Sequence, residues 1–445
     1  MRVLKFGGTS IGHPSQIRKV LNIPDISSNN IIVLSAFSGT TNLLSEFIEQ
    51  LKIQNWIICE QLINIIEDNH FSISNDLLSS LEFKKIAYNR IKQSIKLLKR
   101  FLDRKISTSD EKEILAQGEL LSVKIIYLYL LEKNIDVAIL HSLDYMKINE
   151  TREPDFSFIK SRLNSELNKY TECKLFITSG FICKNHKNKI DNLGRGGSDY
   201  TATIIGNIVN ASKIEIWTDI DGLHNNDPRF VENTQAITHI SYNEAGELAY
   251  FGAKVLHPSS ITPAQQVNIP VVIKNSLSPE KEGTIISDYS VSNGVKAIAA
   301  KDGITTIKIR SGRMMQAYGF LRKIFEVFEK YRTSVDMLTT SEISVAMTID
   351  NTSNLEQIKA ELSLLGEVEI EKNQSIICVV GDFNQIGNSS IQNIIDALDT
   401  IPLQMISFGS SKINISFVIH SNNKIEALNA INACILENNL CLVSH

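Results

Sequence analysis

The chain lacks any cysteine pairing pattern. Its six cysteines never approach CxxC spacing, so the sequence supports neither a zinc site nor a redox pair. We expect reduced, mostly buried thiols, as is typical of a cytoplasmic protein. The cysteines are Cys59, Cys173, Cys183, Cys378, Cys434 and Cys441.

An excess of one charge and long apolar runs are also absent. Lysine and arginine number 45 against 49 aspartates and glutamates, a net charge of -4, and the basic residues are spread along the chain. This argues against nucleic acid as a partner. The longest apolar stretches, such as 125–131, fall well short of the roughly 20 residues that span a bilayer. The N-terminus reads as a strand entering a glycine turn, so we expect neither a signal peptide nor a membrane segment.

What is present is an ordinary globular composition, 43% hydrophobic and 21% charged, over 445 residues. That length exceeds what one hydrophobic core sustains, so two or three domains are expected. Strand-like runs alternate with helical patterns such as Leu121, Ile125 and Leu128, which predicts an α/β fold with a mainly parallel sheet and helices on both faces. The strand-like runs are Val3–Phe6, Ile31–Leu34, Val137–Leu140, Leu175–Thr178, Ile214–Trp217 and Val271–Ile273.

The pattern breaks at 276–293, which is rich in Ser, Gly, Pro, Asn and charge and is our candidate linker. Two shorter units follow, each in the βαββαβ order of ferredoxin-like domains, and such duplicated units often pair through sheet edges. In the first we expect strands at 305–309, 334–339, 344–349 and 367–370, with helices at 320–330 and 355–364. In the second we expect strands at 375–380, 404–408 and 412–419, with helices at 391–398 and 425–436.

Two glycine or hydroxyl loops follow the first two strands. In the first, Lys5 to Ser10 (KFGGTS), Gly7 and Gly8 let backbone amides approach a polyphosphate, and Lys5 meets its charge. The alternative is a tight turn with a surface lysine. In the second, 35–42 (SAFSGTTN), the hydroxyls either cap the next helix or line a ligand crevice, since loops at the carboxyl ends of strands form that crevice in open α/β sheets.

A third loop, Gly194 to Asp199 (GRGGSD), combines groups that rarely occur together in a structural turn. Arg195 offers a planar fork for a carboxylate, and Ser198 with the glycine amides suits phosphate. Asp199 is placed to fix a cation such as Lys5. The sequence therefore favours a functional loop over a purely structural turn.

A fourth segment, 217–229 (WTDIDGLHNNDPR), leaves a strand into a turn-rich loop. Thr218 and Asp219 suit nucleotide contacts and Arg229 suits phosphate, whereas simple chain reversal is the alternative. Phe251 to Lys254 is expected to follow on a helix, with Lys254 either a ligand group or a solvated helix end. His257-Pro258 is interpreted as structural.

Glu119 lies in an apolar helical run. Glutamate is almost never buried unpaired, so this position invites a cationic partner such as a substrate ammonium group. An ordinary salt bridge is the competing interpretation.

Taken together, the motifs resemble those of the aspartokinases of the amino acid kinase family. They occur in the family's order along the chain, and the second half is similar to the tandem ACT regulatory domains of the same enzymes. The resemblance implies a kinase domain at 1–290 and ACT domains at 298–445, which are either consecutive, at about 298–372 and 373–445, or interleaved. The motifs are KFGGTS at 5–10, GRGGSDYTA at 194–202, WTDIDG at 217–222, DPR at 227–229 and FGAKVLHP at 251–258.

The resemblance also implies residue roles. Lys5 would stabilise the transferring phosphoryl group, oriented by Asp199. Arg195 would pair with the α-carboxylate of aspartate and Glu119 with its α-ammonium group. The remaining substrate residues would be Ser35, Thr41, Phe181 and Ser198, and the nucleotide residues Lys5, Gly7, Gly8, Thr218, Asp219, His224, Arg229 and Lys254. The effector residues would be Gly319, Phe320, Ser334, Val335, Asp336, Thr340, Ser341 and Glu342.

The implied function is phosphorylation of the β-carboxylate of L-aspartate by ATP with Mg2+, inhibited by lysine, in a homodimer or higher homo-oligomer formed through the ACT domains. A carboxylate nucleophile needs positioning and charge neutralisation rather than a general base, which these motifs supply. His224 departs from the family's usual tyrosine, Asn225-Asn226 from a threonine pair, and 313–315 differs beside the effector site. The alternatives are a related kinase for glutamate, acetylglutamate, carbamate or UMP, and an effector-binding regulatory subunit.

Overall fold

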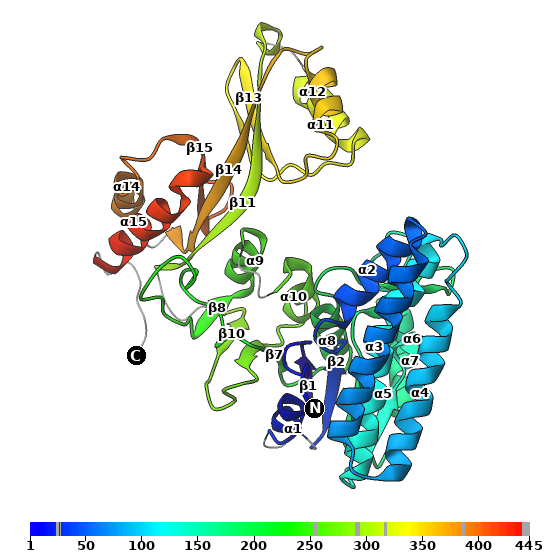
Figure 1. Ribbon diagram of the computed structural model, residues 1–445. Coiled ribbons are helices and arrows are strands. Elements are labelled where there is room, and N and C mark those ends of the chain that lie inside the picture. Colours follow the sequence, from blue (N-terminus) through cyan, green and yellow to red (C-terminus); the bar gives the residue numbers. More distant parts are fainter. Residues whose placement is uncertain are drawn as a thin grey trace. The chain divides into compact units, whose positions relative to one another are not determined.

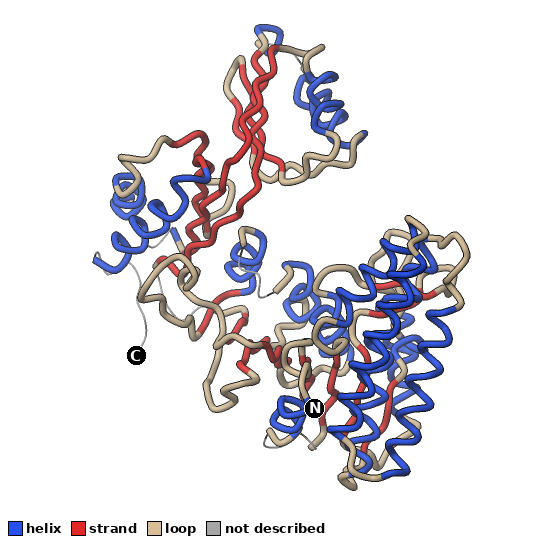
Figure 2. Tube along the Cα trace, viewed as in Figure 1, coloured by secondary structure: helices blue, strands red, loops and turns tan. Residues whose placement is uncertain are grey.

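The structure is a computed structural model that describes residues 1–23, 26, 28–252, 256–289, 294–315, 318–383 and 388–437. It contains two compact units, Met1–Leu223 with Leu256–Tyr289, and His224–Val255 with Ser290–His445. The chain therefore leaves the first unit after Leu223 and returns to it at Leu256. Figures 1 and 2 show the elements of each unit.

The first unit is built on a mainly parallel sheet, as the sequence predicts. Its strands follow the order β3-β4-β2-β1-β7-β9-β10, in which every pair is parallel except β9 with β10. All six expected strands are confirmed. The strands are β1 (Arg2–Phe6), β2 (Asn30–Leu34), β3 (Val137–Leu140), β4 (Leu175–Ser179), β7 (Ile214–Thr218), β9 (Val271–Asn275) and β10 (Thr284–Ser287), with a separate hairpin of β5 (Ile182–Lys184) and β6 (Ile190–Asn192).

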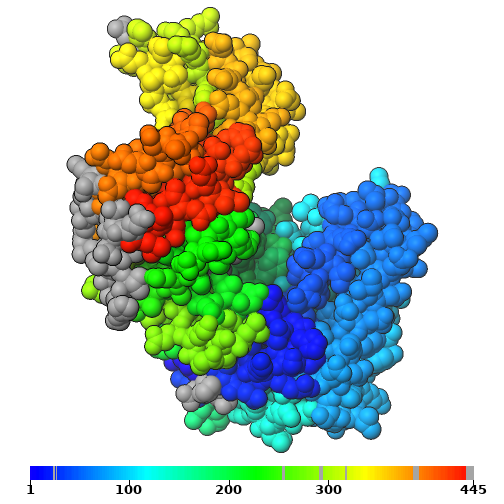
Figure 3. Space-filling view, turned by 60° about the vertical axis from the view of Figure 1, so that its left-hand side comes forward, coloured from blue at the N-terminus to red at the C-terminus, as the bar shows by residue number. Residues whose placement is uncertain are grey.

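Helices pack on this sheet in two groups. One contains α2 (Thr40–Lys52), α3 (Trp56–Leu77), α4 (Leu81–Lys99) and α5 (Thr108–Glu132), which lie side by side in Figure 1, with α5 against β2, β3 and β4. The mid-blue α3 and α4 form a continuous face in Figure 3. The other contains α7 (Phe156–Leu167), α8 (Gly197–Ile208) and α10 (Pro258–Gln265), with α8 against β1, β2 and β7. Two short helices, α1 (Pro14–Leu21) and α6 (Ser142–Tyr145), complete the unit.

Helix α5 is the central helix of the first group. It begins with a capping box between Ser107 and Asp110, which satisfies two backbone amides at its first turn. By length and composition alone it is apolar enough to cross a membrane, contrary to the expectation that no such stretch exists, but 72% of its most apolar window is buried inside the unit. The apolarity of α5 is thus explained by its position in the core.

The second unit contains one six-stranded sheet, in the order β12-β13-β11-β14-β16-β15. Its two longest strands are β11 (Val295–Arg310) and β14 (Glu367–Gly381). The others are β12 (Leu338–Thr340), β13 (Ser344–Ile349), β15 (Leu403–Phe408) and β16 (Asn414–His420). The helices are α9 (Tyr242–Tyr250), α11 (Phe320–Lys330), α12 (Leu355–Leu362), α14 (Asn388–Asp396) and α15 (Lys424–Glu437), with strand β8 (His239–Ser241) before α9 and single 3-10 turns at Gly312–Met314 and Ser421–Asn423.

The expectation of two strands at 367–370 and 375–380 is wrong, because both belong to β14. The C-terminal half of β11 pairs with the first half of β14, and its N-terminal half pairs with the second, across register shifts near Ile304. Each end of the sheet covers its own apolar core, one around Ile324 and Met347 and the other around Phe417 and Ile431. Continuous pairing of two long strands therefore joins the two ferredoxin-like halves.

Three smaller expectations need correction. The strand expected at 334–339 begins only at Leu338, because residues 333–337 are irregular. The proposed linker 276–293 contains β10, while 290–293 lie outside the described residues. The helix expected at 251–254 is not found at 251–252, because α9 ends at Tyr250, and 253–254 lie outside the described residues. Among the described cysteines, all are free and all are buried except the partly exposed Cys173, whereas Cys441 lies outside the described residues.

Candidate active site

The site lies where parallel strands of the first unit end. The carboxyl ends of β1, β2, β4 and β7 lie at one edge of the sheet, and the segments that follow them include the glycine loop after Lys5, the loop 35–42, Phe181 and Asp219. Ligands of open α/β sheets bind at this edge. The fold thus brings together motifs that lie more than 200 residues apart in sequence, such as those of Lys5 and Thr218.

A buried ion pair marks the centre of this edge. Lys5 is the penultimate residue of β1, and its Nζ lies 2.7 Å from Oδ1 of Asp199 in the first turn of α8. The side chains are 12% and 11% exposed, so water screens the pair only weakly. The predicted pairing of these two residues is therefore present, and it holds the lysine ammonium group at the strand end.

The start of α8 is held tightly against β4. Gly196, the residue before the helix, has φ 69, a left-handed conformation that favours glycine. A Cβ on Gly180 would lie 2.6 Å from Cβ of Ser198, so only glycine allows this approach. Phe181 has φ 66, uncommon for an aromatic residue, and donates its backbone N–H to Oγ1 of Thr201 at 3.1 Å. Such constrained backbone clusters at functional sites.

Glu119 is 4% exposed, and its Oε2 has no hydrogen-bond partner among the described residues. Burial raises the pKa of its carboxyl to about 8, although backbone N–H groups of Glu119 and Ala36 act in the opposite direction. The expected alternative, a salt bridge within the chain, is not observed for this residue in the described structure. A carboxyl in this environment favours a bound cation.

Ala36 brings Glu119 to the β1 loop, a role that the sequence analysis missed. A Cβ on Gly118 would lie 2.9 Å from Cβ of Ala36, and one on Gly8 would lie 3.0 Å from its carbonyl oxygen. The loop after β2 therefore packs closely between α5 and the loop that contains Gly7 and Gly8. No residue-type signal marks Ala36, because its contribution is a backbone amide and a small volume.

Ser35 and Thr41 flank this loop. The Ser35 carbonyl oxygen accepts a hydrogen bond from Ser122 of α5 at 2.7 Å, which fixes the end of β2. Helix α2 begins after Gly39, at φ 79, without a side-chain cap, so the alternative of a capping hydroxyl is not realised. The Thr41 side chain is exposed on the first turn.

Arg195 has an exposed side chain and no ion pair with any carboxylate of the described residues. His257 lies near it: burial first, and then the Arg195 charge, lowers the pKa of the His257 imidazole. His257 precedes α10 as its N-cap, in line with its structural interpretation. The Arg195 guanidinium is thus available for a carboxylate ligand.

Of the residues expected to contact the nucleotide, Thr218 is the last residue of β7 and Asp219 follows it. Oγ1 of Thr218 donates to Oδ1 of Asp219 at 3.1 Å, and the Thr218 carbonyl accepts the backbone N–H of Ser276 at 2.8 Å. Gly7 donates its N–H to the Trp217 carbonyl. Near the end of β9, Lys274 Nζ lies 5.2 Å from the Trp217 ring centroid.

His224 and Arg229 belong to the second unit. His224 Nδ1 lies 3.0 Å from Oγ1 of Thr234. Arg229 is held by Asp227, with an Nη2 to Oδ2 distance of 2.6 Å, and this pairing raises the pKa of the guanidinium. Lys254 lies outside the described residues.

The effector residues occupy one half of the second unit. Gly319 (φ 78) precedes α11, which begins at Phe320. Ser334, Val335 and Asp336 precede β12, and the other three, Thr340, Ser341 and Glu342, lie at its far end. Asp336 is 2% exposed by side chain; its Oδ1 lies 3.0 Å from Lys301 Nζ and accepts a hydrogen bond from Tyr250. The Asp336 carboxylate is therefore already engaged in this structure.

Residues 1–275 match the amino acid kinase family, which is well over half of the chain, and residues 377–434 match an ACT domain. The chain belongs to the amino acid kinase family. Within that family, it is 32% identical to chloroplastic aspartokinase 3 of Arabidopsis thaliana, over 99% of this chain and 82% of the relative. It is therefore an aspartokinase by family.

Solved aspartokinases share the fold over their whole length. Escherichia coli aspartokinase III in complex with aspartate and ADP, in the R-state, superposes with a TM-score of 0.86 at 29% identity, covering 98% of this chain and 100% of that one. The same enzyme with lysine and aspartate, in the T-state, gives 0.79 at 29% identity, with 97% and 99% covered. The expected family and fold class are confirmed.

Proposed function

We propose that this aspartokinase transfers the γ-phosphate of ATP to the β-carboxylate of L-aspartate, giving 4-phospho-L-aspartate. The observation that carries the proposal is the buried Lys5–Asp199 pair at the end of the central strand, with a nearby buried glutamate that lacks a cation. A cation for developing phosphoryl charge and an anion for an ammonium group are the two requirements of this reaction.

In this mechanism, aspartate is held at both ends of its amino acid group. Glu119 binds the α-ammonium group, and Arg195 donates two parallel hydrogen bonds to the α-carboxylate. The β-carboxylate is then directed toward Lys5. Phe181 and Ser198, held against β4, complete the wall with Ser35 and Thr41. Because the nucleophile is already ionised at neutral pH, no general base is needed.

Lys5 acts during transfer itself. Charge moves through the γ-phosphoryl oxygens as the bond to ADP lengthens, and the ammonium group stabilises it most in the transition state. Asp199 pairs with Lys5 and holds its ammonium group at the strand end. The amides of Gly7, Gly8 and the α8 N-terminus supply further donors without reorganisation.

Mg2+ fits this site as an ion carried by the nucleotide. Within the described ranges there is no group of three His, Cys, Asp or Glu residues that could form a protein cage. Mg2+ usually binds substrate phosphates, one or two carboxylates and several waters. Asp219, exposed after β7, would offer such a carboxylate, and the ion would neutralise the β- and γ-phosphates. Thr218, His224, Arg229 and Lys254 are proposed to hold the rest of the nucleotide.

L-Lysine is the proposed inhibitor, bound by the ACT half through the effector residues given above. A glycine turn before α11 suits an α-carboxylate. Asp336 suits an ammonium group through its Oδ2, which has no hydrogen-bond partner among the described residues, while Lys301 and Tyr250 engage its Oδ1. We propose that this occurs between two chains of a cytoplasmic homodimer or higher homo-oligomer. The reaction would open the diaminopimelate route to lysine and the routes to threonine and methionine.

An acceptor panel tests the activity. Purified protein with ATP and Mg2+ is assayed for ADP release with L-aspartate, L-glutamate, N-acetyl-L-glutamate, carbamate and UMP. We expect release with aspartate alone, and formation of an acyl phosphate that hydroxylamine traps. Turnover with another acceptor would reassign the substrate, and no turnover with any of them would favour the regulatory-subunit alternative.

A further inference from the structure

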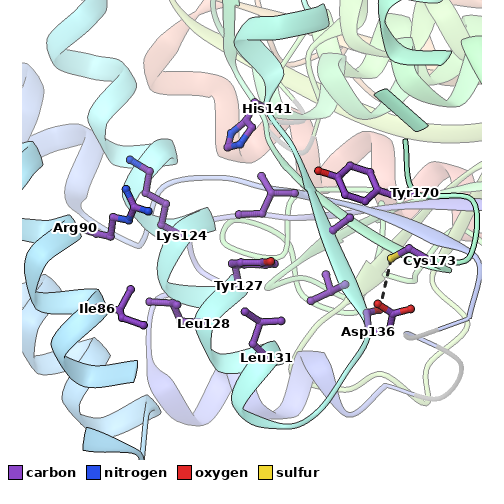
Figure 4. A pocket seen from close by; sticks show the side chains of 13 residues that line it. Ile86, Arg90, Lys124, Tyr127, Leu128, Leu131, Asp136, His141, Tyr170 and Cys173 are labelled. Carbon is purple, nitrogen blue, oxygen red and sulfur yellow. Dashed lines mark hydrogen bonds between the residues drawn. The ribbon is translucent and has the colours of Figure 1, made fainter. Parts of the chain in front are cut away.

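A cavity of about 720 Å³ lies in the first unit, away from the candidate active site. It is bounded by α4, α5, the edge strand β3 and the segment 170–173 that follows α7, as Figure 4 shows. Its volume is within the range of small-molecule sites, roughly 300 to 1,000 Å³. Neither the kinase residues nor the effector residues line it.

One end of the cavity is cationic. Arg90 of α4 and Lys124 of α5 approach each other there, and His141, directly after β3, faces the same end (Figure 4). Arg90 is exposed and Lys124 is partly buried, and neither forms an ion pair with a carboxylate anywhere in the described ranges. Burial, and then the charge of Arg90, lowers the pKa of Lys124. Two uncompensated cations side by side favour an anion between them.

The remaining wall is apolar. Leu128 and Leu131 of α5 continue from Lys124, and Val137 and Ile139 of β3 lie opposite. The Tyr127 side chain lies above Leu128 and Leu131 in Figure 4 and offers an aromatic surface for an aromatic or aliphatic body. The carboxylate in the cavity, Asp136, lies at the end away from Arg90, beside Cys173, whose Sγ is 3.8 Å from the Asp136 carbonyl oxygen.

We propose that this cavity binds a small amphipathic anion. Its carboxylate or phosphate head would bind Arg90 and Lys124, and its apolar body would cover Tyr127, Leu128 and Leu131. The polarity of the cavity selects this class: a simple inorganic anion leaves the apolar wall exposed, and a neutral or cationic molecule leaves the two cations uncompensated. A second carboxylate at the far end of the ligand is disfavoured by Asp136.

Calorimetry with matched probes tests the chemistry. Phenylbutyrate and phenylpropyl phosphate carry the two anionic heads on one aromatic body, phenylbutyramide removes the charge, and inorganic phosphate removes the body. We expect both aromatic anions to bind at least about tenfold more tightly than the amide and than phosphate, about 1.4 kcal/mol in each comparison. The tighter of the two aromatic anions then identifies the head group. Equal affinity of the amide, or of inorganic phosphate, would overturn the proposal.

Variants locate the binding. The double change Arg90→Gln with Lys124→Gln should weaken phenylbutyrate at least about tenfold, whereas Lys96→Gln, an exposed lysine elsewhere on α4, should leave it unchanged. Circular dichroism checks the fold of each variant.

A second measurement needs no variant. Bound phenylbutyrate should slow alkylation of Cys173 by iodoacetamide, measured by mass spectrometry of the peptide that contains it, because Cys173 lines the cavity. Unchanged Cys173 modification at saturating probe, or undiminished binding by the folded double variant, would contradict the site.

Discussion

Lys5 and Glu119 differ in whether a group of opposite charge lies beside them. The Lys5 ammonium group has its carboxylate partner at 2.7 Å, whereas the Glu119 carboxyl is buried without a cation. With a pKa of about 8, Glu119 is mostly protonated at neutral pH until a positive ligand arrives. Binding of the proposed ammonium group at Glu119 would therefore be coupled to loss of a proton.

Lys5→Ala should remove most of the activity and leave the fold intact. The lysine meets charge that develops during phosphoryl transfer, and loss of one such donor costs on the order of 100- to 1,000-fold in kcat. Steady-state ADP release and circular dichroism together measure this. An unchanged kcat in the folded variant would refute the role.

Glu119→Gln should change stability and substrate binding in opposite directions. The folded pKa of about 8 lies above the ordinary value of 4.5, so the wild type holds an extra proton and loses stability as pH rises from about 4.5 through about 8. The glutamine variant lacks this loss, so its Tm without ligands should exceed that of the wild type at pH 8.5 but not at pH 4.

The same variant should bind aspartate at least about tenfold more weakly, since the ammonium group loses a buried partner. Thermal unfolding across pH, with and without aspartate, separates the two effects. A parallel pH dependence of Tm in both proteins would show that Glu119 is not the group responsible.

Arg195→Lys should raise the KM for aspartate with a smaller change for ATP. A lysine point charge cannot reproduce the two parallel hydrogen bonds of a guanidinium fork on a carboxylate. Separate titrations of aspartate and ATP measure this. If only the KM for ATP changed, Arg195 would belong to the nucleotide site.

At the scale of elements, the approach of α5 to the loop after β2 depends on Gly118. A Cβ there would lie 2.9 Å from Cβ of Ala36, which has no flexible atoms to move aside. Gly118→Ala should therefore destabilise the protein by about 1 to 3 kcal/mol despite the better helix propensity of alanine. It should also raise the aspartate KM, because Ala36 and Glu119 would separate.

A glycine in open space supplies the control. A Cβ on Gly246, inside α9, would meet no atom within 4 Å, so Gly246→Ala should stabilise by roughly 0.5 to 1 kcal/mol. Urea unfolding of both variants compares them. Equal effects of the two changes would show that the packing of α5 is looser than the structure indicates.

At the scale of the whole molecule, the prediction concerns regulation by the ACT half. L-Lysine should inhibit ADP release, and Asp336→Ala should raise the lysine concentration needed for half-inhibition about tenfold or more if Asp336 accepts the effector ammonium group. Asp350 is the matched control, since it too pairs with Lys301, at 3.0 Å, but is not a proposed effector residue. Asp350→Ala should retain inhibition. If lysine binds between two chains as proposed, it should also tighten the proposed oligomer in sedimentation experiments, because effector binding and assembly would then be reciprocal.

Threonine and methionine serve as comparison effectors. Inhibition by threonine alone, or lysine inhibition that survives Asp336→Ala undiminished, would reject the effector assignment without touching the kinase activity. A ligand shifts an equilibrium only by its differential affinity for the two states.

The sequence by itself determined the local elements and the chemistry of the loops. The apolar runs at 3–6 and 31–34 predict strands because their periodicity is local, and the Arg195 to Asp199 loop indicates its ligands by residue type. Only the tertiary structure decided which positions require a small residue or a particular backbone group. Ala36 and Gly180 lie at close approaches between segments, and their residue types alone do not predict these contacts. Likewise, β11 and β14 are long continuous strands that join the two ferredoxin-like halves. Their continuity depends on pairing between strands that are distant in sequence, which local sequence patterns do not encode.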